Sequence, residues 1–236
     1  MPTVLVTGAS RGIGLEFVRQ YCADDWSVLA CCRDPERAEA LRALASAHSR
    51  LQVHALDVTD FAAIDALAKA LRSQPIDVLL NNAGLYGPRP GADHDPHQEF
   101  GHMDYEHWRR LFAVNTQAPF KMAEAFIEHV AASAQRKIVA ISTGMASIGD
   151  VGGGFYAYRT TKAALNMAMA ALANDLRARR IRVGLLCPGW VRTDMGGPHA
   201  TLAVQDSVRG LRARIAELDD ARSGAFYSYK GTPKLW

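Results

Sequence analysis

Cysteine is scarce in this sequence, and long hydrophobic runs are missing. The cysteines form no CxxC pair and no disulfide-like spacing, which is typical of a protein in a reducing cytosol. Met1-Pro2 runs directly into a strand-like segment without a signal peptide, and no apolar stretch is long enough to span a bilayer. We therefore expect a cytoplasmic protein that makes no membrane contact.

An excess of charge of one sign is also lacking. Lysine and arginine number 27 against 24 aspartates and glutamates, a net charge of +3. The densest basic run, residues 177–182, falls at an expected helix end, where cations complement the helix dipole. This balance argues against a nucleic-acid partner. The sequence has no internal repeat, low-complexity tract or linker, so we expect a single domain over residues 1–236.

The sequence does contain a repeated alternation of short apolar runs and helical patterns. Strands of a parallel sheet, joined by right-handed helical crossovers, produce such an alternation. The expected strands are residues 3–6, 27–32, 51–56, 76–80, 137–141, 181–186 and 224–228.

Several expected helices carry start or stop signals. Asp34 is expected to cap a helix with Pro35 in its first turn, and Asp60 to cap the next helix. A long helical pattern covers residues 105–130, and Pro119 should kink or interrupt it.

The first apolar run ends in a glycine-rich turn, Thr7–Gly14, that leads into a helical pattern. Its glycines follow the spacing GxxxGxG. Strand, glycine-rich turn and helix together form the context in which a dinucleotide pyrophosphate binds at a helix N-terminus. The alternative is a tight turn that needs glycine only for positive φ angles.

The tip of the second expected strand bears Cys32 and Arg33, where NAD-specific folds usually carry an acidic residue. A carboxylate there would repel a ribose 2′-phosphate, whereas Arg33 could bind it, and Arg11 could reach the same group. These two arginines predict a preference for NADP over NAD. The alternative is that both are solvated surface residues, with Arg33 paired to Asp34.

Other segments are expected at the carboxyl edge of the sheet, where a nucleotide binds. Asp57 and Val58 follow the third expected strand, and the small residues of Asn81–Gly84 follow the fourth. Ser142 and Thr143 follow the fifth strand, so their hydroxyls should face the ligand crevice.

Tyr158 and Lys162 stand four residues apart in a helical pattern, which places both side chains on one face, one turn apart. An ordinary tyrosine has a pKa of about 10, and a cation within a few Å can lower it by roughly 1–3 units. The pair therefore suggests a tyrosine proton donor tuned by a lysine. The alternative is a surface tyrosine and lysine on an amphipathic helix.

Residues 85–104 interrupt the alternation, because three prolines and three glycines disfavour regular structure. His94, His97, His102 and His107 stand among acidic residues there, superficially like a metal site. Their spacing matches no closed zinc pattern, so we expect a solvated loop near the site and no metal.

Together these segments resemble the short-chain dehydrogenase/reductase family over nearly the whole chain. The matching signatures are Thr7–Gly14 (TGxxxGxG), Asn81–Gly84 (NNAG), Asn115, a strand-end hydroxyl, Tyr158 with Lys162 (YxxxK), and Pro188–Thr193 (PGxxxT). Tyr156–Thr160 and Ser228–Pro233 are similar to the carbonyl-reductase and C-factor-like branch. The resemblance implies an α/β fold, a Rossmann-type doubly wound parallel sheet of about seven strands with helices on both faces, in a three-layer sandwich.

The resemblance implies hydride transfer between NADP(H) and a small carbonyl or alcohol substrate. Tyr158 would protonate the developing alkoxide, and Lys162 would lower the Tyr158 pKa and hold the nicotinamide ribose. Thr143 would donate a hydrogen bond to the carbonyl oxygen. Asn115 would support a water that links Lys162 to solvent, and Thr193 would contact the nicotinamide amide.

Thr143 is a departure from the family, which commonly has the second serine of a Ser-Ser pair at this place. Its methyl group stiffens χ1, so Ser142 or Ser147 could supply the hydroxyl instead. The residues expected to bind NADP, preferred as NADPH over NADH, are Gly8, Ser10, Arg11, Gly12, Ile13, Gly14, Arg33, Asp57, Val58, Asn82, Ala83, Gly84, Tyr158, Lys162, Pro188, Gly189, Val191 and Thr193.

Three matters stay open at the level of sequence. The substrate is unidentified, although its pocket walls are expected from residues 85–104, 144–155 and 190–205, the last of these as the substrate loop. The oligomeric state is open between a monomer, a homodimer and a homotetramer. A different class of function, an NADP-binding signalling or sensor protein with weak catalysis, competes with the enzyme, as does an epimerase or dehydratase on the same scaffold.

Overall fold

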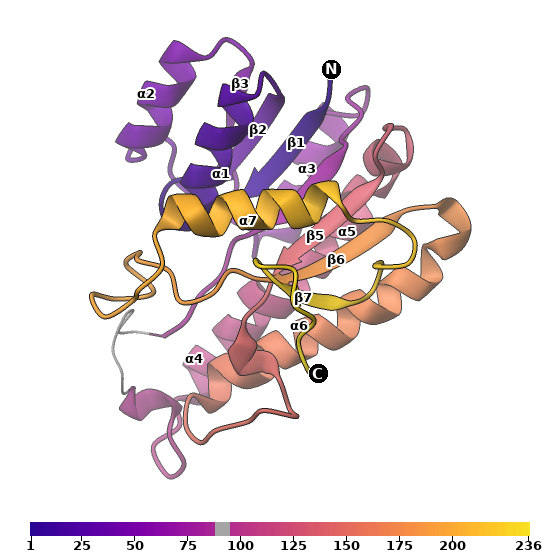
Figure 1. The fold of residues 1–236 in the computed structure, drawn as a ribbon. Coiled ribbons are helices and arrows are strands. Elements are labelled where there is room, and N and C mark those ends of the chain that lie inside the picture. The colour runs from indigo at the N-terminus through magenta and orange to yellow at the C-terminus, as the bar shows by residue number, and fades with distance from the viewer. Residues whose placement is uncertain (88–94) are drawn as a thin grey trace.

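A computed structural model of the chain describes residues 1–87 and 95–236, and its centre is one seven-stranded sheet. All strand pairs are parallel, in the order β3-β2-β1-β4-β5-β6-β7 (Figure 1). The strands are β1 (Thr3–Thr7), β2 (Ser27–Cys32), β3 (Leu51–Ala55), β4 (Val78–Asn81), β5 (Lys137–Ile141), β6 (Arg182–Cys187) and β7 (Phe226–Ser228).

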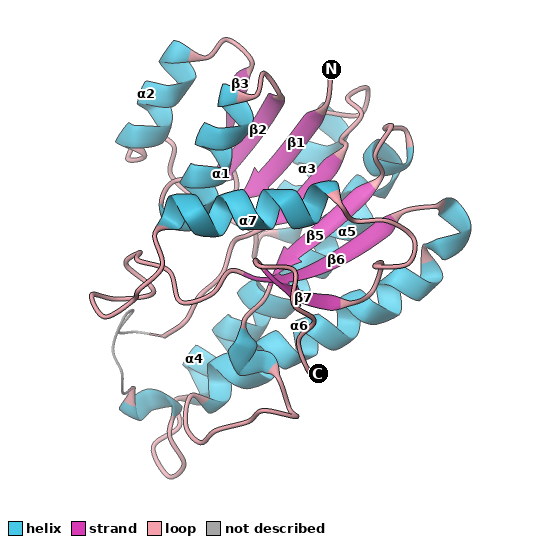
Figure 2. Cartoon of the chain, viewed as in Figure 1, coloured by secondary structure: helices cyan, strands magenta, loops and turns pink. Residues whose placement is uncertain are grey.

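Helices connect the strands and cover both faces of the sheet (Figure 2). The α-helices are α1 (Gly12–Ala23), α2 (Glu39–Ala47), α3 (Phe61–Ala70), α4 (Tyr105–Phe112), α5 (Ala118–Ala131), α6 (Tyr156–Asp175) and α7 (Val204–Ala216). Shorter turns are the 3-10 segments η1 (Pro96–Gln98), η3 (Gly144–Ala146) and η4 (Arg177–Arg179), and the π-helical segment η2 (Ala113–Gln117).

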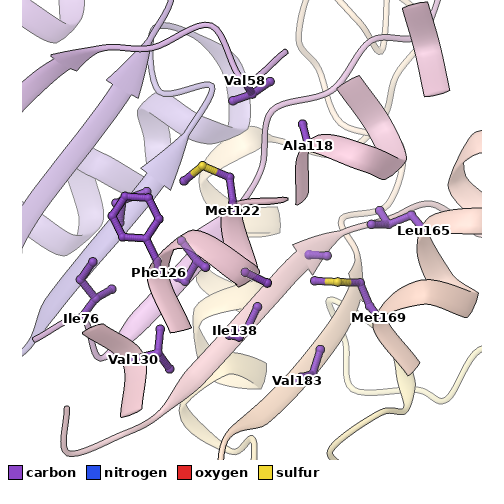
Figure 3. Packing of buried hydrophobic residues seen from close by; sticks show 14 of the residues in the cluster. Val58, Ile76, Ala118, Met122, Phe126, Val130, Ile138, Leu165, Met169 and Val183 are labelled. Atoms are coloured by element: carbon purple, nitrogen blue, oxygen red, sulfur yellow. The ribbon is translucent and has the colours of Figure 1, made fainter. Parts of the chain in front are cut away.

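Two hydrophobic clusters, one on each face of the sheet, make this a three-layer sandwich. Side chains alternate between the faces along a strand, so Leu5 of β1 joins one cluster while Val4 and Val6 join the other. The first cluster packs β-strand residues against α3, α5 and α6; Figure 3 shows Phe126 of α5 and Met169 of α6 within it. The second packs the sheet against α1, α2 and α7. The predicted doubly wound Rossmann-type fold is therefore confirmed.

The sequence order of the strands reverses on the two sides of β1. From β1 the chain proceeds to β2 and β3 on one side, and then returns to place β4 on the other. Parallel α/β sheets bind ligands at such a switch point, outside the carboxyl ends of the strands. A ligand site is therefore expected at the loops that follow β1 and β4.

One expected helix start is wrong and another is confirmed. The helix after β2 begins at Glu39 and not at Pro35. The Asp34 carboxylate accepts the Arg37 N–H at 3.3 Å, which closes a turn before α2 instead of capping a helix. Asp60 is the N-cap of α3, where its side chain accepts the Ala63 N–H at 2.9 Å.

The long helix predicted over residues 105–130 is helical throughout but not of one type. Pro119 lies in the first turn of α5 and breaks no helix, because the π-helical segment η2 precedes it. Proline has no N–H to donate to the preceding turn, and a wider π turn accommodates the missing bond. The segment carries Asn115 at its centre.

The histidines of the irregular loop form no metal site in the described residues. His94 lies outside the described part of the chain. Within residues 1–87 and 95–236, no group of three or more histidine, cysteine, aspartate or glutamate side chains is placed to hold a metal ion. In the same part of the chain, no helix is long and apolar enough to cross a membrane.

Candidate active site

A cleft with a volume of about 250 Å³ lies at the carboxyl ends of the strands. Most of the sequence-predicted site residues meet in it, although they come from the segments after five different strands, β1, β2, β3, β4 and β6, and from α6. The predicted residues that line it are Gly8, Ser10, Arg11, Gly12, Ile13, Gly14, Arg33, Asp57, Val58, Asn82, Ala83, Gly84, Tyr158, Lys162, Pro188 and Thr193. Asn115, Thr143, Gly189 and Val191 are not part of its lining.

The glycine-rich turn is packed so closely that side chains are excluded from it. Gly8 has a φ of +67°, and a Cβ on Gly14 would lie only 2.1 Å from the Gly8 carbonyl oxygen. Asn82 supports the turn, because its Nδ2 donates to the carbonyls of Thr7 and Gly8 at 3.0 and 3.2 Å. Asn82 therefore acts on the turn itself.

The first turn of α1 receives no side-chain cap, since the N-cap residue Arg11 makes no such bond. Gly12, Ile13 and Gly14 of this turn line the cleft. Uncapped amides and the positive end of a helix dipole suit an anion. Together with the glycine cradle, this geometry fits a dinucleotide pyrophosphate.

Asp57 lies between two exposed arginines that come from different elements. Partial burial acts to raise the Asp57 pKa, but hydrogen bonds from the Thr59 N–H and hydroxyl and the charges of Arg33 and Arg110 outweigh it and hold the pKa low. Arg33 stands at the tip of β2, as expected. Asp34, its alternative partner, accepts from the Arg37 N–H.

Arg11 does not stand free in the cleft. Its guanidinium is 2.5 Å from the carboxylate of Asp194, which belongs to the loop after β6, and both side chains are exposed. A ribose phosphate would have to compete with this carboxylate for Arg11.

Tyr158 and Lys162 are both buried, on the cleft-facing side of α6. The Lys162 ammonium donates to the Ile141 carbonyl at 2.9 Å, at the end of β5. Burial lowers the pKa of Lys162 to about 8. Because both side chains are buried, the alternative of a surface tyrosine and lysine on an amphipathic helix is excluded.

The electrostatic surroundings of Tyr158 differ from the expectation. Burial raises the Tyr158 pKa, a hydrogen bond with the Thr143 side chain partly opposes this, and Cys187 and Tyr86 raise it further. The predicted lowering by Lys162 is therefore wrong for this structure. Desolvation penalises a buried phenolate, and the Lys162 ammonium is engaged by the Ile141 carbonyl.

The three candidate hydroxyls have different partners. Ser142 donates to Asn166 Oδ1 at 2.6 Å, and Ser147 donates to the Trp236 carbonyl at 3.3 Å. Thr143 begins η3, where its Oγ1 accepts the Met145 N–H at 3.2 Å, and it is the hydroxyl that bonds Tyr158. Thr143 is thus the hydroxyl beside the Tyr158 phenol, whereas Ser142 is the one of the three that lines the cleft.

Asn115 is fully buried behind the cleft, and its amide is fully used. Its Oδ1 accepts the Leu85 N–H, and its Nδ2 donates to the Leu85 carbonyl, both at 2.8 Å. Nδ2 also donates to Thr161 Oγ1 of α6 at 3.1 Å. Asn115 thus ties the loop after β4 to the helix that carries Tyr158.

The loop after β6 places Thr193 in the cleft, but not Gly189 or Val191. Gly189 has a φ of +83° and turns the chain, and a Cβ there would lie 2.9 Å from the Leu202 side chain. Val191 is buried and forms a bridge to Leu202. Thr193 approaches the glycine-rich turn, since its methyl group would be 3.4 Å from a Cβ on Gly12.

Sequence reasoning missed several residues that line the cleft. Arg110 and Val114, one helical turn apart on α4 and η2, are the clearest cases. Met195, by contrast, lies in the expected substrate loop 190–205 and does line the cleft. Val114 precedes Asn115, so the cleft-facing side of this helix could have been inferred from the Asn115 signature.

The comparisons agree with this geometry. The family model described as "short chain dehydrogenase" matches residues 2–201. The chain belongs to the short-chain dehydrogenase/reductase family. It is 40% identical to C-signal of Myxococcus xanthus over 172 residues, which is 72% of this chain and 99% of that protein. Its relatives place it in the carbonyl-reductase and C-factor-like branch of this oxidoreductase family.

Two solved structures are similar over their full length. The carbonyl reductase Sniffer of D. melanogaster has a TM-score of 0.89 and 32% identity, with 100% of both chains covered. The NADPH-bound carbonyl reductase from chicken fatty liver has a TM-score of 0.89 and 34% identity, with 100% of this chain and 99% of that chain covered.

Proposed function

We propose that this oxidoreductase is an NADP(H)-dependent carbonyl reductase that acts on small carbonyl or alcohol substrates. The observation that carries the proposal is the buried Tyr158 phenol, bonded to Thr143 and one helical turn from Lys162. Arg33 at the tip of β2 and the NADPH-bound relative support NADP as the cofactor. NADP(H), when bound, supplies or accepts the hydride.

The remaining chemistry belongs to the protein. Burial raises the Tyr158 pKa, so its phenol is protonated at neutral pH and is a weaker acid than a free tyrosine. It would still protonate an alkoxide oxygen, because an alkoxide is a much stronger base than a phenolate. Thr143 would donate a hydrogen bond to the same oxygen. Burial lowers the Lys162 pKa to about 8, so near pH 7 most of its amine is still a positively charged ammonium.

Lys162 also has donors to spare for a cofactor ribose. An ammonium has three N–H donors, and the Ile141 carbonyl takes one. Asn115 would act indirectly, by holding the Leu85 backbone and α6 in place around this ammonium.

Substitution of the proton donor tests the proposal. With NADPH as reductant and a panel of small ketones, aldehydes and quinones, we expect the wild type to oxidise NADPH with at least one substrate. Tyr158→Phe should reduce kcat by about 10²–10⁴-fold, because it removes the general acid. NADPH affinity, measured by fluorescence titration, should stay within about threefold. Reductase activity near wild type in Tyr158→Phe would contradict the assigned role.

If the wild type binds NADPH tightly but oxidises it with no substrate of the panel, the result would instead favour a binding or signalling protein. The name of the relative C-signal makes this the relevant alternative.

A further inference from the structure

The helix that carries Tyr158 begins without a cap of its own. Phe155 is its N-cap, in the left-handed conformation with a φ of 52°, and makes no side-chain cap bond. Helices usually begin with a serine, threonine, aspartate or asparagine whose oxygen accepts a first-turn N–H. Tyr158 occupies the third position of α6, so its backbone N–H has no acceptor within the helix.

Gln98 of η1 supplies the missing acceptor from sixty residues earlier in the chain. Its Oε1 accepts the Tyr158 N–H at 2.8 Å. The Gln98 side chain is fully buried, with an exposed fraction of 0%. A bond of this kind is normally made by a residue next to the helix, so here a remote turn restrains the first turn of α6.

The other end of the same amide holds the surroundings of the Tyr158 ring. Gln98 Nε2 donates to the Tyr86 carbonyl at 2.8 Å and to Asp95 Oδ2 at 3.0 Å. The Tyr86 ring packs edge-on against the Tyr158 ring, with centroids 4.7 Å apart. One buried amide therefore links the backbone of Tyr158 to the backbone of the residue that packs on its ring.

We propose that Gln98 is a positioning residue for Tyr158, acting as a long-range cap of the catalytic helix that holds the phenol toward Thr143. Its catalytic consequence rests on the proposed function. An amide serves both ends, because its oxygen accepts from the Tyr158 N–H and its nitrogen donates to the Tyr86 carbonyl. A displacement of about 1 Å at a reacting group can cost 10²-fold in rate, so the cap acts on kcat.

Amide hydrogen exchange, resolved by residue with NMR, tests the cap without any substrate. In the wild type, the Tyr158 amide should exchange at least tenfold more slowly than the Tyr156 amide. Gln98→Met keeps the size of the side chain but removes both polar groups, and should accelerate exchange at Tyr158 at least tenfold. His97→Ala changes an exposed side chain of the same turn and should leave it unchanged. An unprotected Tyr158 amide in the wild type overturns the proposal, even if the variant does not fold.

Kinetics with NADPH and 4-nitrobenzaldehyde then separate positioning from simple packing. We expect Gln98→Met to lower kcat by about 10–100-fold, with KM and the NADPH Kd each within threefold of wild type. A kcat equal to that of His97→Ala overturns the proposal. A wild type that does not turn over the aldehyde but shows the protected amide contradicts the proposed function only, so the two failures are distinguishable.

Discussion

Tyr158 and Lys162 share one face of α6 but are held by different groups. The phenol bonds Thr143, while the ammonium bonds the Ile141 carbonyl. Sequence spacing predicted that the two side chains share a face. It could not predict that burial would raise the Tyr158 pKa, because desolvation depends on every element packed around the ring. Nor could it predict that Ser142 and Ser147 would each donate to a group distant in the chain, Asn166 Oδ1 and the Trp236 carbonyl.

At the same scale, Arg33 should determine the choice of cofactor. Arg33→Asp replaces a cation that could bind a 2′-phosphate by an anion that repels it. A hydrogen bond to a charged group is worth roughly 1.5–3 kcal/mol, so we expect NADPH affinity to fall by about 10–100-fold or more. NADH affinity should change by less than threefold. Isothermal titration calorimetry measures both.

Arg72→Asp is the matched control for Arg33→Asp, because Arg72 is also exposed but lies outside the cleft. It should leave both affinities unchanged. Equal losses of NADPH and NADH affinity in Arg33→Asp would show that Arg33 does not bind the 2′-phosphate.

At the scale of elements, the glycine-rich turn was predictable and its partner was not. The spacing in Thr7–Gly14 identifies a turn that leads into a helix, but not that Asn82 holds it by two hydrogen bonds. The π-helical segment η2 shows the same limit. Pro119 signalled an irregularity, but not that it would be a π-helical segment whose Asn115 bonds to Leu85 and to Thr161 of α6.

Gly14→Ala tests the closeness of this turn. The new Cβ would meet the Gly8 carbonyl oxygen at 2.1 Å, and Asn82 Nδ2 at 2.5 Å. Overpacking of this kind costs about 1–3 kcal/mol, so urea denaturation should show a loss of that size. NADPH binding should weaken at least tenfold, because the turn must shift.

Gly153→Ala is the control, since a Cβ there has nothing within 4 Å. Its stability should stay within about 0.5 kcal/mol of wild type. Equal stability and equal NADPH affinity in the two variants would contradict the close packing of the turn around Gly14.

At the scale of the whole molecule, the alternation of strands and helices was enough to predict a doubly wound sheet. Each apolar run became a strand within one or two residues of its expected bounds, because parallel strands are buried on both faces and admit few other patterns. The sequence did not predict how the loops close around the site. Gln98 lies in the least regular stretch, where no periodic pattern guides inference, and the helical pattern around Arg110 did not reveal which of its sides lines the cleft.

A cleft assembled from many loops should stabilise the entire fold when filled. NADPH at a hundred times its Kd should add about 2.7 kcal/mol, if it binds only the folded state. For a chain of this length, we expect the thermal midpoint to rise by about 5–10 °C. NADH at the same concentration should raise it less. Differential scanning fluorimetry measures the shifts, and no shift with saturating NADPH would contradict the cofactor assignment.

The position of β1 at the centre of the sheet has a consequence for biosynthesis. Its Val4 pairs with Val28 on one side but with Val78 on the other. At a ribosomal rate of about 5–20 residues per second, that second neighbour is synthesised roughly 4–15 s after β1. For this interval β1, which is buried along its whole length in the folded protein, has at least one open edge. Chaperone demand should therefore be greatest before the fourth strand leaves the ribosomal tunnel, and should fall sharply afterwards.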